Sequence, residues 1–404
     1  MIKVLSYSNV THGSLAEISS LMRALGVETM GIPLMRGKSQ FWVLQIDSLR
    51  PQAANILKQE LLSRGAETAL PRGALDLSNK SCTVLVFATD KQLGELYPKL
   101  IMHQFGLPAL AKEIKNTITN YRSIPEPLTV GASTFHFGRR TYVMGILNVT
   151  PDSFSDGGKY STIESAVERA LQMEQSGADI IDIGGESTRP GARPVGAKEE
   201  LGRVLPVIKA IRKRSRVPLS IDTYKAAVAE AAVDSGVDLI NDISALRADR
   251  KMARVAKKYN VPVALMHMQG TPRNMQLNPS YNDLWSEVLE YLRKSIEIAQ
   301  SYGILPSKII VDPGIGFGKK IENNLEIIDN LSQLKVLGRA ILAGPSRKSF
   351  IGKILKDDTA SRLEGTVAAA ALLAALGADI IRVHDVEQMN RAIKVSDAII
   401  RRKK

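Results

Sequence analysis

The feature that most restricts the fold of this 404-residue chain is a short unit that occurs three times after residue 175. The copies read SGADIIDI at 176–183, SGVDLINDI at 235–243 and LGADIIRVHD at 376–385. In each copy a glycine follows a helical pattern and can adopt the left-handed conformation that ends a helix. An apolar run and then polar residues complete the unit. Continuous apolar runs of this length are typical of parallel strands that are buried on both faces.

Further strand–helix units before and between these copies bring the total to eight. Their predicted strands start near Tyr142, Asp179, Pro218, Asp238, Pro262, Lys308, Ala340 and Asp379. Eight units in about 265 residues favour an α/β fold of the closed (β/α)8 TIM barrel type. A doubly wound open sheet is the competing interpretation of the same periodicity.

Polar clusters at the ends of the predicted strands help to decide between these two folds. In chain order they read NVTPDSFSDGG, GGESTRPGA, IDT, ND, MHMQGT, DPGIGFGK, GPSRKSF and RVHD. In a TIM barrel the catalytic residues lie at the carboxyl ends of several different strands. Stability alone does not require such clusters, so their recurrence favours a barrel with one composite site.

The segment 118–136 contains two close prolines and no sustained periodicity, which indicates a domain boundary. We therefore predict a small α/β domain at 1–125 and the barrel at 126–404. In the first domain, FWVLQI and CTVLVFA predict strands at 41–46 and 82–88. The stretches ALGVETMGIP and SRGAETALP both suggest a helix, a glycine and then a strand. No catalytic cluster occurs there, and we expect a role in self-association.

Charge and composition limit the functional class. The chain has 54 basic and 41 acidic residues, a net charge of +13, which fits a basic cytosolic protein or one that attracts an anionic substrate. Aromatic residues are 5% of the chain and do not alternate with basic ones, so we expect no nucleic-acid partner. No apolar run approaches the ~20 residues of a membrane span. The single cysteine, Cys82, excludes an intramolecular disulfide and suits the cytoplasm.

The last two predicted strand ends indicate a phosphate site. GPSRKSF follows the seventh strand and RVHD ends the eighth, where barrels often bind phosphate. Arg347, Lys348, Arg382 and His384 supply positive charge and hydrogen-bond donors there. Ordinary surface charge is the alternative for two of them. The glycine-rich GIGFGK is only a weak phosphate signal by itself.

Three polar residues end predicted strands three, four and six: Asp222, Asn241 and Asp312. In a barrel each would point into the mouth, and a buried carboxylate is costly unless it accepts hydrogen bonds. A heterocycle with amino and ring N–H groups would supply these bonds, and Met266, Met268 and Phe317 could enclose its flat ring. The alternatives are that the three polar residues cap helices and that Met266, Met268 and Phe317 belong to the core.

The motifs MGILNVTPDSFSDGG, GGESTRPGA, SIDT, DPGIGFGK, GPSRKSF and RVHD, in this order, closely resemble the dihydropteroate synthase family over roughly residues 130–404. The resemblance implies a (β/α)8 barrel. It implies an enzyme that joins 4-aminobenzoate to 6-hydroxymethyl-7,8-dihydropterin diphosphate and releases pyrophosphate. It also implies Mg2+ as cofactor, a homodimer and a target of sulfonamides. The electron-rich pterin makes an SN1-like substitution plausible.

The resemblance also implies three groups of site residues. The pterin would contact Asp222, Asn241, Ile243, Met266, Asp312, Phe317, Lys348 and Arg382. The diphosphate would contact Asn148, Arg189, Arg382 and His384, and Asn148 would also reach Mg2+. The aminobenzoate would contact Thr188, Pro190, Phe317, Lys348 and Ser349. The expected catalytic residues are Asp222, Arg189, Lys348 and Arg382.

Two other functions compete with the synthase. A pterin-dependent methyltransferase domain of the same superfamily would share the pterin-reading positions but needs no diphosphate site. STRPGA and PSRKSF favour the synthase over the methyltransferase. A non-catalytic pterin-binding scaffold is the third hypothesis, and the presence of Thr188, Arg189, Lys348, Arg382 and His384 argues against it. We further expect the GGESTRPGARP loop at 184–194 to act as a lid that becomes ordered when ligands bind.

Overall fold

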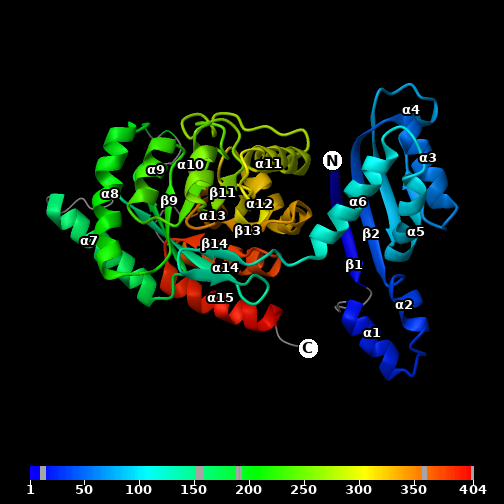
Figure 1. The fold of residues 1–404 in the computed structure, drawn as a ribbon, viewed down its shortest axis with the longest axis horizontal. Helices are drawn as coiled ribbons and strands as arrows, with labels where there is room; N and C mark the ends of the chain where they lie inside the picture. Colours follow the sequence, from blue (N-terminus) through cyan, green and yellow to red (C-terminus); the bar gives the residue numbers. More distant parts are fainter. Residues whose placement is uncertain (10–14, 151–158, 188–190, 192, 357–361, 402–404) are drawn as a thin grey trace. The chain divides into compact units, whose positions relative to one another are not determined.

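The protein divides into two compact units, Met1–Ser123 and Ile124–Lys404 (Figure 1). The computed structural model describes residues 1–9, 15–150, 159–187, 191, 193–356 and 362–401. The sequence places the boundary after residue 125, two residues from the division at 123.

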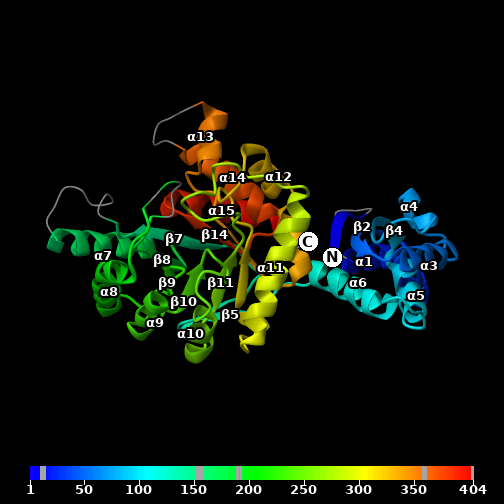
Figure 2. The same ribbon diagram turned by 90° about the horizontal axis from the view of Figure 1, so that it is seen from above.

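Eight parallel strands in the second unit form a closed barrel (Figure 2). They are β7 (Tyr142–Asn148), β8 (Ile180–Gly184), β9 (Leu219–Asp222), β10 (Leu239–Asp242), β11 (Val263–Met266), β12 (Ile309–Asp312), β13 (Ala340–Ala343) and β14 (Ile380–Val383). Each strand begins within one residue of its predicted start, and β14 pairs with β7 to close the barrel. The prediction of a TIM barrel is therefore confirmed, and the open sheet is excluded.

Helices follow the strands and lie outside them (Figures 1 and 2). They are α7 (Lys159–Gln175), α8 (Ala197–Arg214), α9 (Ala226–Asp234), α10 (Met252–Tyr259), α11 (Leu284–Ser301), α12 (Ile321–Asp329), α13 (Ser349–Leu355), α14 (Leu363–Ala375) and α15 (Val386–Ile400). Short 3-10 helices occur at Pro306–Lys308 and Leu331–Leu337. Among the described residues, no helix combines the length and the apolar character that a membrane span requires.

The recurring glycine of the sequence unit ends a helix, as predicted. Gly177, Gly236 and Gly377 have φ angles of +91°, +106° and +105°, values that residues with a side chain rarely adopt. Each glycine lies immediately before a barrel strand, so it turns the chain from an outer helix back into the barrel.

The aspartate two residues after each of these glycines fixes the start of its strand. Its carboxylate accepts a hydrogen bond from the backbone N–H of the preceding barrel strand in space, and its own N–H donates to a carbonyl of that strand. The carboxylate bonds are Asp179 from Val143 at 2.9 Å, Asp238 from Leu219 at 3.0 Å and Asp379 from Ile341 at 2.9 Å. The repeated sequence is thus a repeated strand-joining device at the amino ends of the strands.

A small hairpin packs against the amino end of the barrel. It consists of β5 (Leu128–Val130) and β6 (Ser133–Phe135), and it joins a buried cluster with the first residues of several strands. The ring of Phe135 meets the ring of Tyr142 edge to face, with centroids 4.6 Å apart. Sequence analysis found no periodicity here because strands of three residues are too short to show one.

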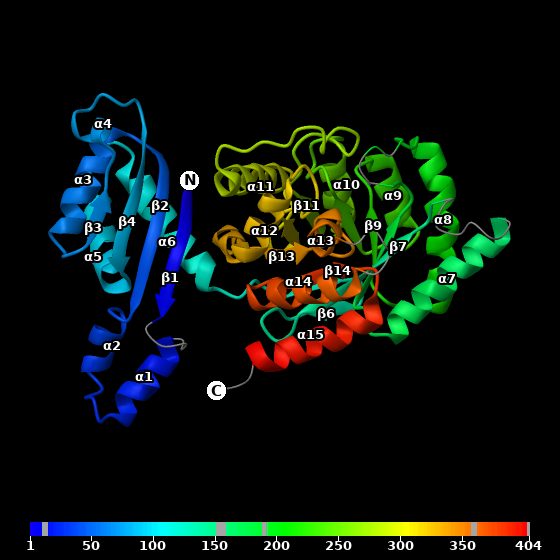
Figure 3. The same ribbon diagram turned by 180° about the vertical axis from the view of Figure 1, so that it is seen from behind.

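The first unit is an antiparallel four-stranded sheet with helices (Figure 3). The strands, in the spatial order β1-β2-β4-β3, are β1 (Ile2–Asn9), β2 (Gln40–Leu49), β4 (Cys82–Thr89) and β3 (Glu67–Ala69). The helices are α1 (Leu15–Ala24), α2 (Gly31–Arg36), α3 (Pro51–Leu62), α4 (Arg72–Leu75), α5 (Asp90–Leu100) and α6 (Leu107–Arg122).

Two details of this unit differ from the sequence interpretation. Helix α2 occupies Gly31–Arg36, so the strand suggested by ALGVETMGIP is wrong, whereas the matching strand β3 exists. Alternation in β2 buries Trp42 and Leu44 completely and leaves Phe41 38% exposed on the other face. One face of the sheet is therefore core, and the other is partly open.

Candidate active site

A pocket lies at the carboxyl ends of the barrel strands, and all eight residues that the resemblance assigns to the pterin line it. The structure adds two further lining residues, Ile315 and Gly344. The complete lining is Asp222, Asn241, Ile243, Met266, Asp312, Ile315, Phe317, Gly344, Lys348 and Arg382. These residues come from six different strand ends, which matches the composite site expected of a barrel.

Three polar residues at the same position of the recurring unit meet inside the barrel. Asp182, Asn241 and Arg382 each follow the repeated aspartate by three residues. One oxygen of Asp182, Oδ2, accepts from Nδ2 of Asn241 at 3.0 Å and from Nε of Arg382 at 2.6 Å. Asp182 is fully buried. Sequence analysis missed this residue, although a charged side chain within an apolar strand, in register with Asn241 and Arg382, was the available signal.

Arg382 joins a second carboxylate in the same cluster. Its guanidinium donates to Oδ2 of Asp222 at 2.7 Å as well as to Asp182. Burial disfavours the charged form of Arg382, but the two carboxylates outweigh it and raise the pKa of the guanidinium. The Oδ1 atoms of Asp182 and Asp222 are buried and have no partner among the described residues. Of the two residues, Asp222 lines the pocket, so its unsatisfied acceptor suits an N–H donor of a bound molecule.

Burial raises the pKa of Asp222 to about 7, with Arg382 opposing the shift. Burial also raises the pKa of Asp312 to about 6, although Oδ1 of Asp312 accepts a hydrogen bond from the N–H of Gly314 at 2.7 Å. Neither these carboxylates nor Asn241 caps a helix, because other residues hold the N-cap positions of α9, α10 and α12. The helix-cap alternative is wrong for all three.

An apolar cluster forms one side of the pocket. It consists of Ile243, Met266, Met268, Met275 and Phe317, with the partly buried Tyr224 packed against it. Such a combination of thioether, aliphatic and aromatic groups suits the faces of a flat ring.

Lys348 connects this apolar side to the charged side. Its Nζ lies 4.1 Å from the centroid of the Phe317 ring, within cation–π distance. Burial lowers the pKa of Lys348 to about 8, and the nearby Arg382 acts in the same direction. Ser349 follows as the exposed first residue of α13.

Three of the four residues expected at the diphosphate, Asn148, Arg382 and His384, lie at the ends of β7 and β14, and the fourth, Arg189, lies outside the described residues. Asn148 is the last residue of β7 and pairs in register with Gly184. His384 follows β14, and its Nδ1 lies 3.0 Å from Oγ of Ser346. Burial and Arg382 lower the pKa of His384 to about 3, so the imidazole is neutral. In contrast, Arg347 is exposed and bonds to Asp385, which fits the surface-charge alternative.

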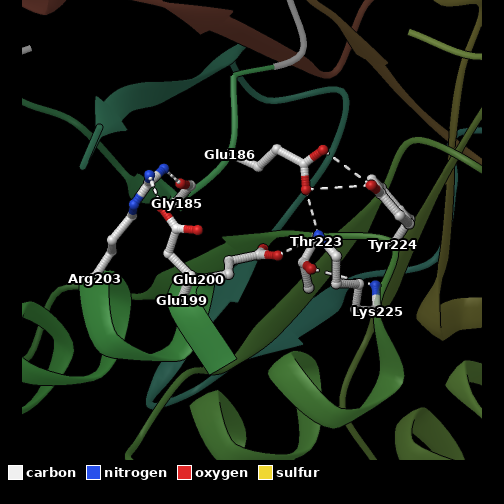
Figure 4. Close-up of polar contacts among 8 residues, drawn as sticks. All are labelled: Gly185, Glu186, Glu199, Glu200, Arg203, Thr223, Tyr224 and Lys225. Atoms are coloured by element: carbon white, nitrogen blue, oxygen red, sulfur yellow. Dashed lines mark hydrogen bonds and ion pairs between the residues drawn. The ribbon is translucent and has the colours of Figure 1, made fainter. Parts of the chain in front are cut away.

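Thr188, Arg189 and Pro190 lie outside the described residues, and so does the central part of the loop expected to act as a lid. The chain that leaves β8 before them is held by several polar contacts (Figure 4). Tyr224 donates to Glu186 at 2.9 Å, and Lys225 bonds to both Glu186 and Glu200. These contacts tie the end of β8 to the segment that follows β9.

No group of three or more acidic, histidine or cysteine side chains among the described residues could hold a metal ion alone. A larger cavity, of about 540 Å³, lies beside α7 and the start of α15. Its Arg169 and Asp385 already bond to His384 and Arg347. None of the predicted site residues lines this cavity.

One relative extends over both units of the chain. The probable bifunctional folylpolyglutamate synthase/dihydropteroate synthase of Halobacterium salinarum is 39% identical over 385 residues, 95% of this chain and 46% of that protein. An alignment of this length must include most of residues 1–123.

Comparisons with known proteins agree on the barrel. The pterin binding enzyme family matches residues 144–384. The dihydropteroate synthase of Synechocystis is 50% identical over 278 residues, covering 69% of this chain and 96% of that protein. A Yersinia pestis dihydropteroate synthase, solved with a sulfonamide drug complex, has a TM-score of 0.64 at 45% identity and covers 68% of this chain and 98% of its own. This chain belongs to the dihydropteroate synthase family and is a transferase.

Proposed function

We propose that the barrel joins 6-hydroxymethyl-7,8-dihydropterin diphosphate to 4-aminobenzoate, giving 7,8-dihydropteroate and pyrophosphate. The observation that carries this proposal is the pocket itself, in which the unsatisfied buried Oδ1 of Asp222 lies beside an apolar side suited to a flat ring. A similar synthase has been solved in the presence of pteroic acid, at 49% identity and a TM-score of 0.63, covering 66% of this chain and all of its own.

In this proposal the protein recognises the edge of the pterin ring through hydrogen bonds. The free Oδ1 of Asp222 accepts N–H bonds from the ring, and Asp312 and Asn241 offer further polar atoms at the same depth. Met266 and Phe317 contact the faces of the ring, with Ile243 beside them. A site that must hydrogen-bond its ligand discriminates strongly against analogues without the matching donors.

Asn148, Arg189, Arg382 and His384 would hold the diphosphate. The neutral His384 contributes an N–H donor, and Arg382 contributes a charge that its two carboxylates hold in place. The site also fits Mg2+, which keeps most of its waters and needs few protein ligands besides phosphate oxygens. The amide oxygen of Asn148 is suitable, because Gly184 beside it carries no side chain. When bound, Mg2+ would neutralise charge on the leaving diphosphate.

The substitution is SN1-like. The bond between the exocyclic methylene carbon and the diphosphate oxygen breaks first, and its electron pair leaves with the pyrophosphate. The electron-rich ring spreads the resulting positive charge, and the carboxylates of Asp222 and Asp312 stabilise it electrostatically. The amine nitrogen of 4-aminobenzoate then forms the new C–N bond and loses a proton. An aromatic amine is already nucleophilic, so the site needs no strong general base.

The aminobenzoate would contact Phe317 and Lys348, together with Thr188 and Pro190, which lie outside the described residues. Ser349 would contact its carboxylate, and the exposed position of Ser349 at the start of α13 is compatible with that role. Arg189 would approach the diphosphate from the same loop.

The proposal is tested by incubating the folded protein with dihydropterin diphosphate, 4-aminobenzoate and Mg2+ and measuring pyrophosphate. We expect release that requires both substrates and falls when Mg2+ is chelated. Folded protein that binds a pterin but releases no pyrophosphate would contradict the synthase. Release that continues after chelation would contradict the role of Mg2+ alone.

We propose in addition that the protein acts as a homodimer in the cytoplasm and that residues 1–123 serve self-association. The partly open face of the first sheet supports this, since Phe41, Val43 and Phe87 lie on it without full burial. The buried single thiol of Cys82 suits a reducing compartment. Sedimentation of the full chain and of residues 124–404 tests the assembly. A truncated chain that remains dimeric would contradict the role of the first unit.

A further inference from the structure

The glycine-rich loop that follows β12 is packed backbone against backbone on the loop that follows β11. Gly314 has φ +69°, and a Cβ there would lie 1.9 Å from the carbonyl oxygen of His267. Gly318 has φ +59°, and a Cβ there would lie 2.5 Å from the carbonyl oxygen of Gln269. Both glycines are therefore required by close approach, and GIGFGK is explained without a bound phosphate.

Side chains add further bonds between the same two loops. Gln276 donates to the carbonyl of Gly316 at 2.9 Å, and Tyr281 donates to the carbonyl of Gly318 at 2.6 Å. The β11 loop carries Met268 and the β12 loop carries Phe317, which belong to the same apolar cluster beside the pocket. The distance between the loops thus determines where these two side chains lie.

Lys319 ends the glycine-rich loop but does not face solvent. It is only 3% exposed, and its Nζ lies 3.0 Å from the carbonyl oxygen of Phe317 and 2.9 Å from Nδ1 of His267. His267 is also buried, and its ring meets the ring of Tyr291 edge to face, with centroids 4.9 Å apart. The backbone N–H of His267 donates to the backbone carbonyl oxygen of Asp312 at 2.9 Å. Lys319 is thus bonded to both loops.

The chemistry of these groups fits a neutral amine. Burial lowers the pKa of Lys319 to about 7, with Asp312 opposing and Lys348 assisting the shift. Burial also lowers the pKa of His267 well below its usual value, so its Nδ1 can accept a hydrogen bond. A neutral lysine amine has two N–H donors, which match the two acceptors that the described residues provide.

We propose that Lys319 is a positioning residue. It holds the Phe317 backbone against His267 and thereby fixes the Phe317 ring at the side of the space into which the pterin ring fits, the pterin gap. The inference rests on the proposed function, because it assigns the pterin to this gap. Lys319 does not touch the ligand. It acts through Phe317, whose ring also makes the cation–π contact with Nζ of Lys348.

The first test compares Lys319→Met with Lys320→Met, because Lys320 is the next residue and is exposed. The probe is 6-hydroxymethylpterin alone, titrated by calorimetry with the full chain. We expect the dissociation constant to rise about tenfold or more in Lys319→Met, which corresponds to about 1.4 kcal/mol. We expect no change in Lys320→Met. Equal affinity in two folded variants would overturn the inference.

A double-mutant cycle separates positioning from a general structural role. If Lys319 acts through Phe317, then Lys319→Met should weaken pterin binding little further in a Phe317→Ala background. Additive losses would overturn the proposal. Lys319→Gln provides the conservative variant, because its amide keeps two N–H donors. We expect it to bind pterin more tightly than Lys319→Met, and equal losses in folded variants would count against the bonds described.

The outcome is distinguishable from failure of the proposed function. If the wild-type chain binds no 6-hydroxymethylpterin and releases no pyrophosphate, the synthase itself is contradicted. If the wild type does both, and Lys319→Met binds the pterin as tightly as the wild type, only the role of Lys319 is contradicted. Where Lys319→Met does not fold, the comparison of Lys319→Gln with the wild type in the Phe317→Ala cycle decides the question.

Discussion

The two ends of the barrel both contain buried or half-buried aspartates, but they use them differently. At the amino end, Asp179, Asp238 and Asp379 accept hydrogen bonds from the neighbouring strands, and none of them has a buried oxygen without a partner. At the carboxyl end, Asp222 lines the pocket and keeps one buried oxygen, Oδ1, without a partner among the described residues, and the fully buried Asp182 below it in β8 does the same. The three aspartates of the amino end are thus satisfied by the protein, whereas Asp222 leaves an acceptor for a ligand.

Burial alone does not distinguish the two ends. Burial raises the pKa of Asp379 at the amino end to about 6, as it raises the pKa of Asp222 at the carboxyl end to about 7. The difference lies in the unsatisfied acceptors and in the pocket that opens beside them. A perturbed pKa therefore identifies a functional carboxylate here only together with an unpaired atom and a cavity.

The largest effect is expected from Asp222→Asn at the carboxyl end of the barrel, which we call the open end because the pocket lies there. The amide cannot stabilise the developing positive charge on the pterin, so kcat/KM should fall about 10³-fold, the upper range for loss of one preorganised electrostatic group. Thermal stability should not fall, because the change removes a costly buried carboxylate. Steady-state pyrophosphate release and thermal melting measure the two quantities. A stable variant with undiminished kcat/KM would contradict the catalytic role that distinguishes Asp222 from the structural aspartates of the amino end.

The opposite result, a loss of stability without a loss of activity, is expected from Asp238→Ala at the amino end, which we call the closed end. The change removes the bond to the Leu219 N–H and leaves Arg212 without its carboxylate partner. We expect about 2–3 kcal/mol less free energy of unfolding, a typical cost for breaking a largely buried pair. The folded fraction should keep its kcat/KM. Denaturant unfolding checks the loss, and a variant that folds normally but is inactive would argue against a purely structural closed end.

Acidification should weaken ligand binding at the open end. The pKa values of Asp222 and Asp312 are raised to about 7 and about 6, so both carboxylates become protonated as the pH falls through that range. The ionised forms accept the pterin N–H groups, and affinity should therefore be highest above pH 7. We expect about tenfold weaker binding of 6-hydroxymethylpterin at pH 5.5 than at pH 8, equivalent to about one pKa unit of coupling. Constant affinity across this pH range would mean that groups other than Asp222 and Asp312 accept the hydrogen bonds of the pterin ring.

The smallest effect concerns the contacts at the edge of the open end. Tyr224→Phe removes the hydroxyl that donates to Glu186 but keeps the ring that packs on the apolar cluster. We expect a loss of about 1 kcal/mol of stability, the usual worth of one partly buried hydrogen bond. The matched control is Tyr259→Phe, whose hydroxyl bonds to the exposed Lys258, and it should melt like the wild type. Equal melting of both variants would show that the Glu186 contact contributes no stability.

Sequence predicted the barrel well because its strands are uniform apolar runs between glycines and polar residues. The recurring unit located Asn241 and Arg382 but not Asp182, since a polar residue within an apolar run was not compared between the copies. Lys319 could not be found either. Its burial depends on contact with His267, 52 residues away in the chain, which no local pattern records.

In the first unit the sequence identified β2 and β4, which alternate or are continuously apolar, and the helix α3. The strand suggested after the first glycine of ALGVETMGIP, at 24–33, is wrong because the chain there forms turns and then begins α2 at Gly31. The hairpin of β5 and β6 was taken for a linker, since its identity depends on packing against the strand starts of the barrel.

The most direct test of the central claim is to follow labelled 4-aminobenzoate through the reaction at the open end. The full chain is incubated with dihydropterin diphosphate, Mg2+ and ring-labelled 4-aminobenzoate, and the products are identified by mass spectrometry. Our account predicts labelled 7,8-dihydropteroate and pyrophosphate in equal amounts, and neither product from Asp222→Asn at the wild-type rate. Pyrophosphate without labelled dihydropteroate, or no turnover by folded protein that binds the pterin, would contradict it.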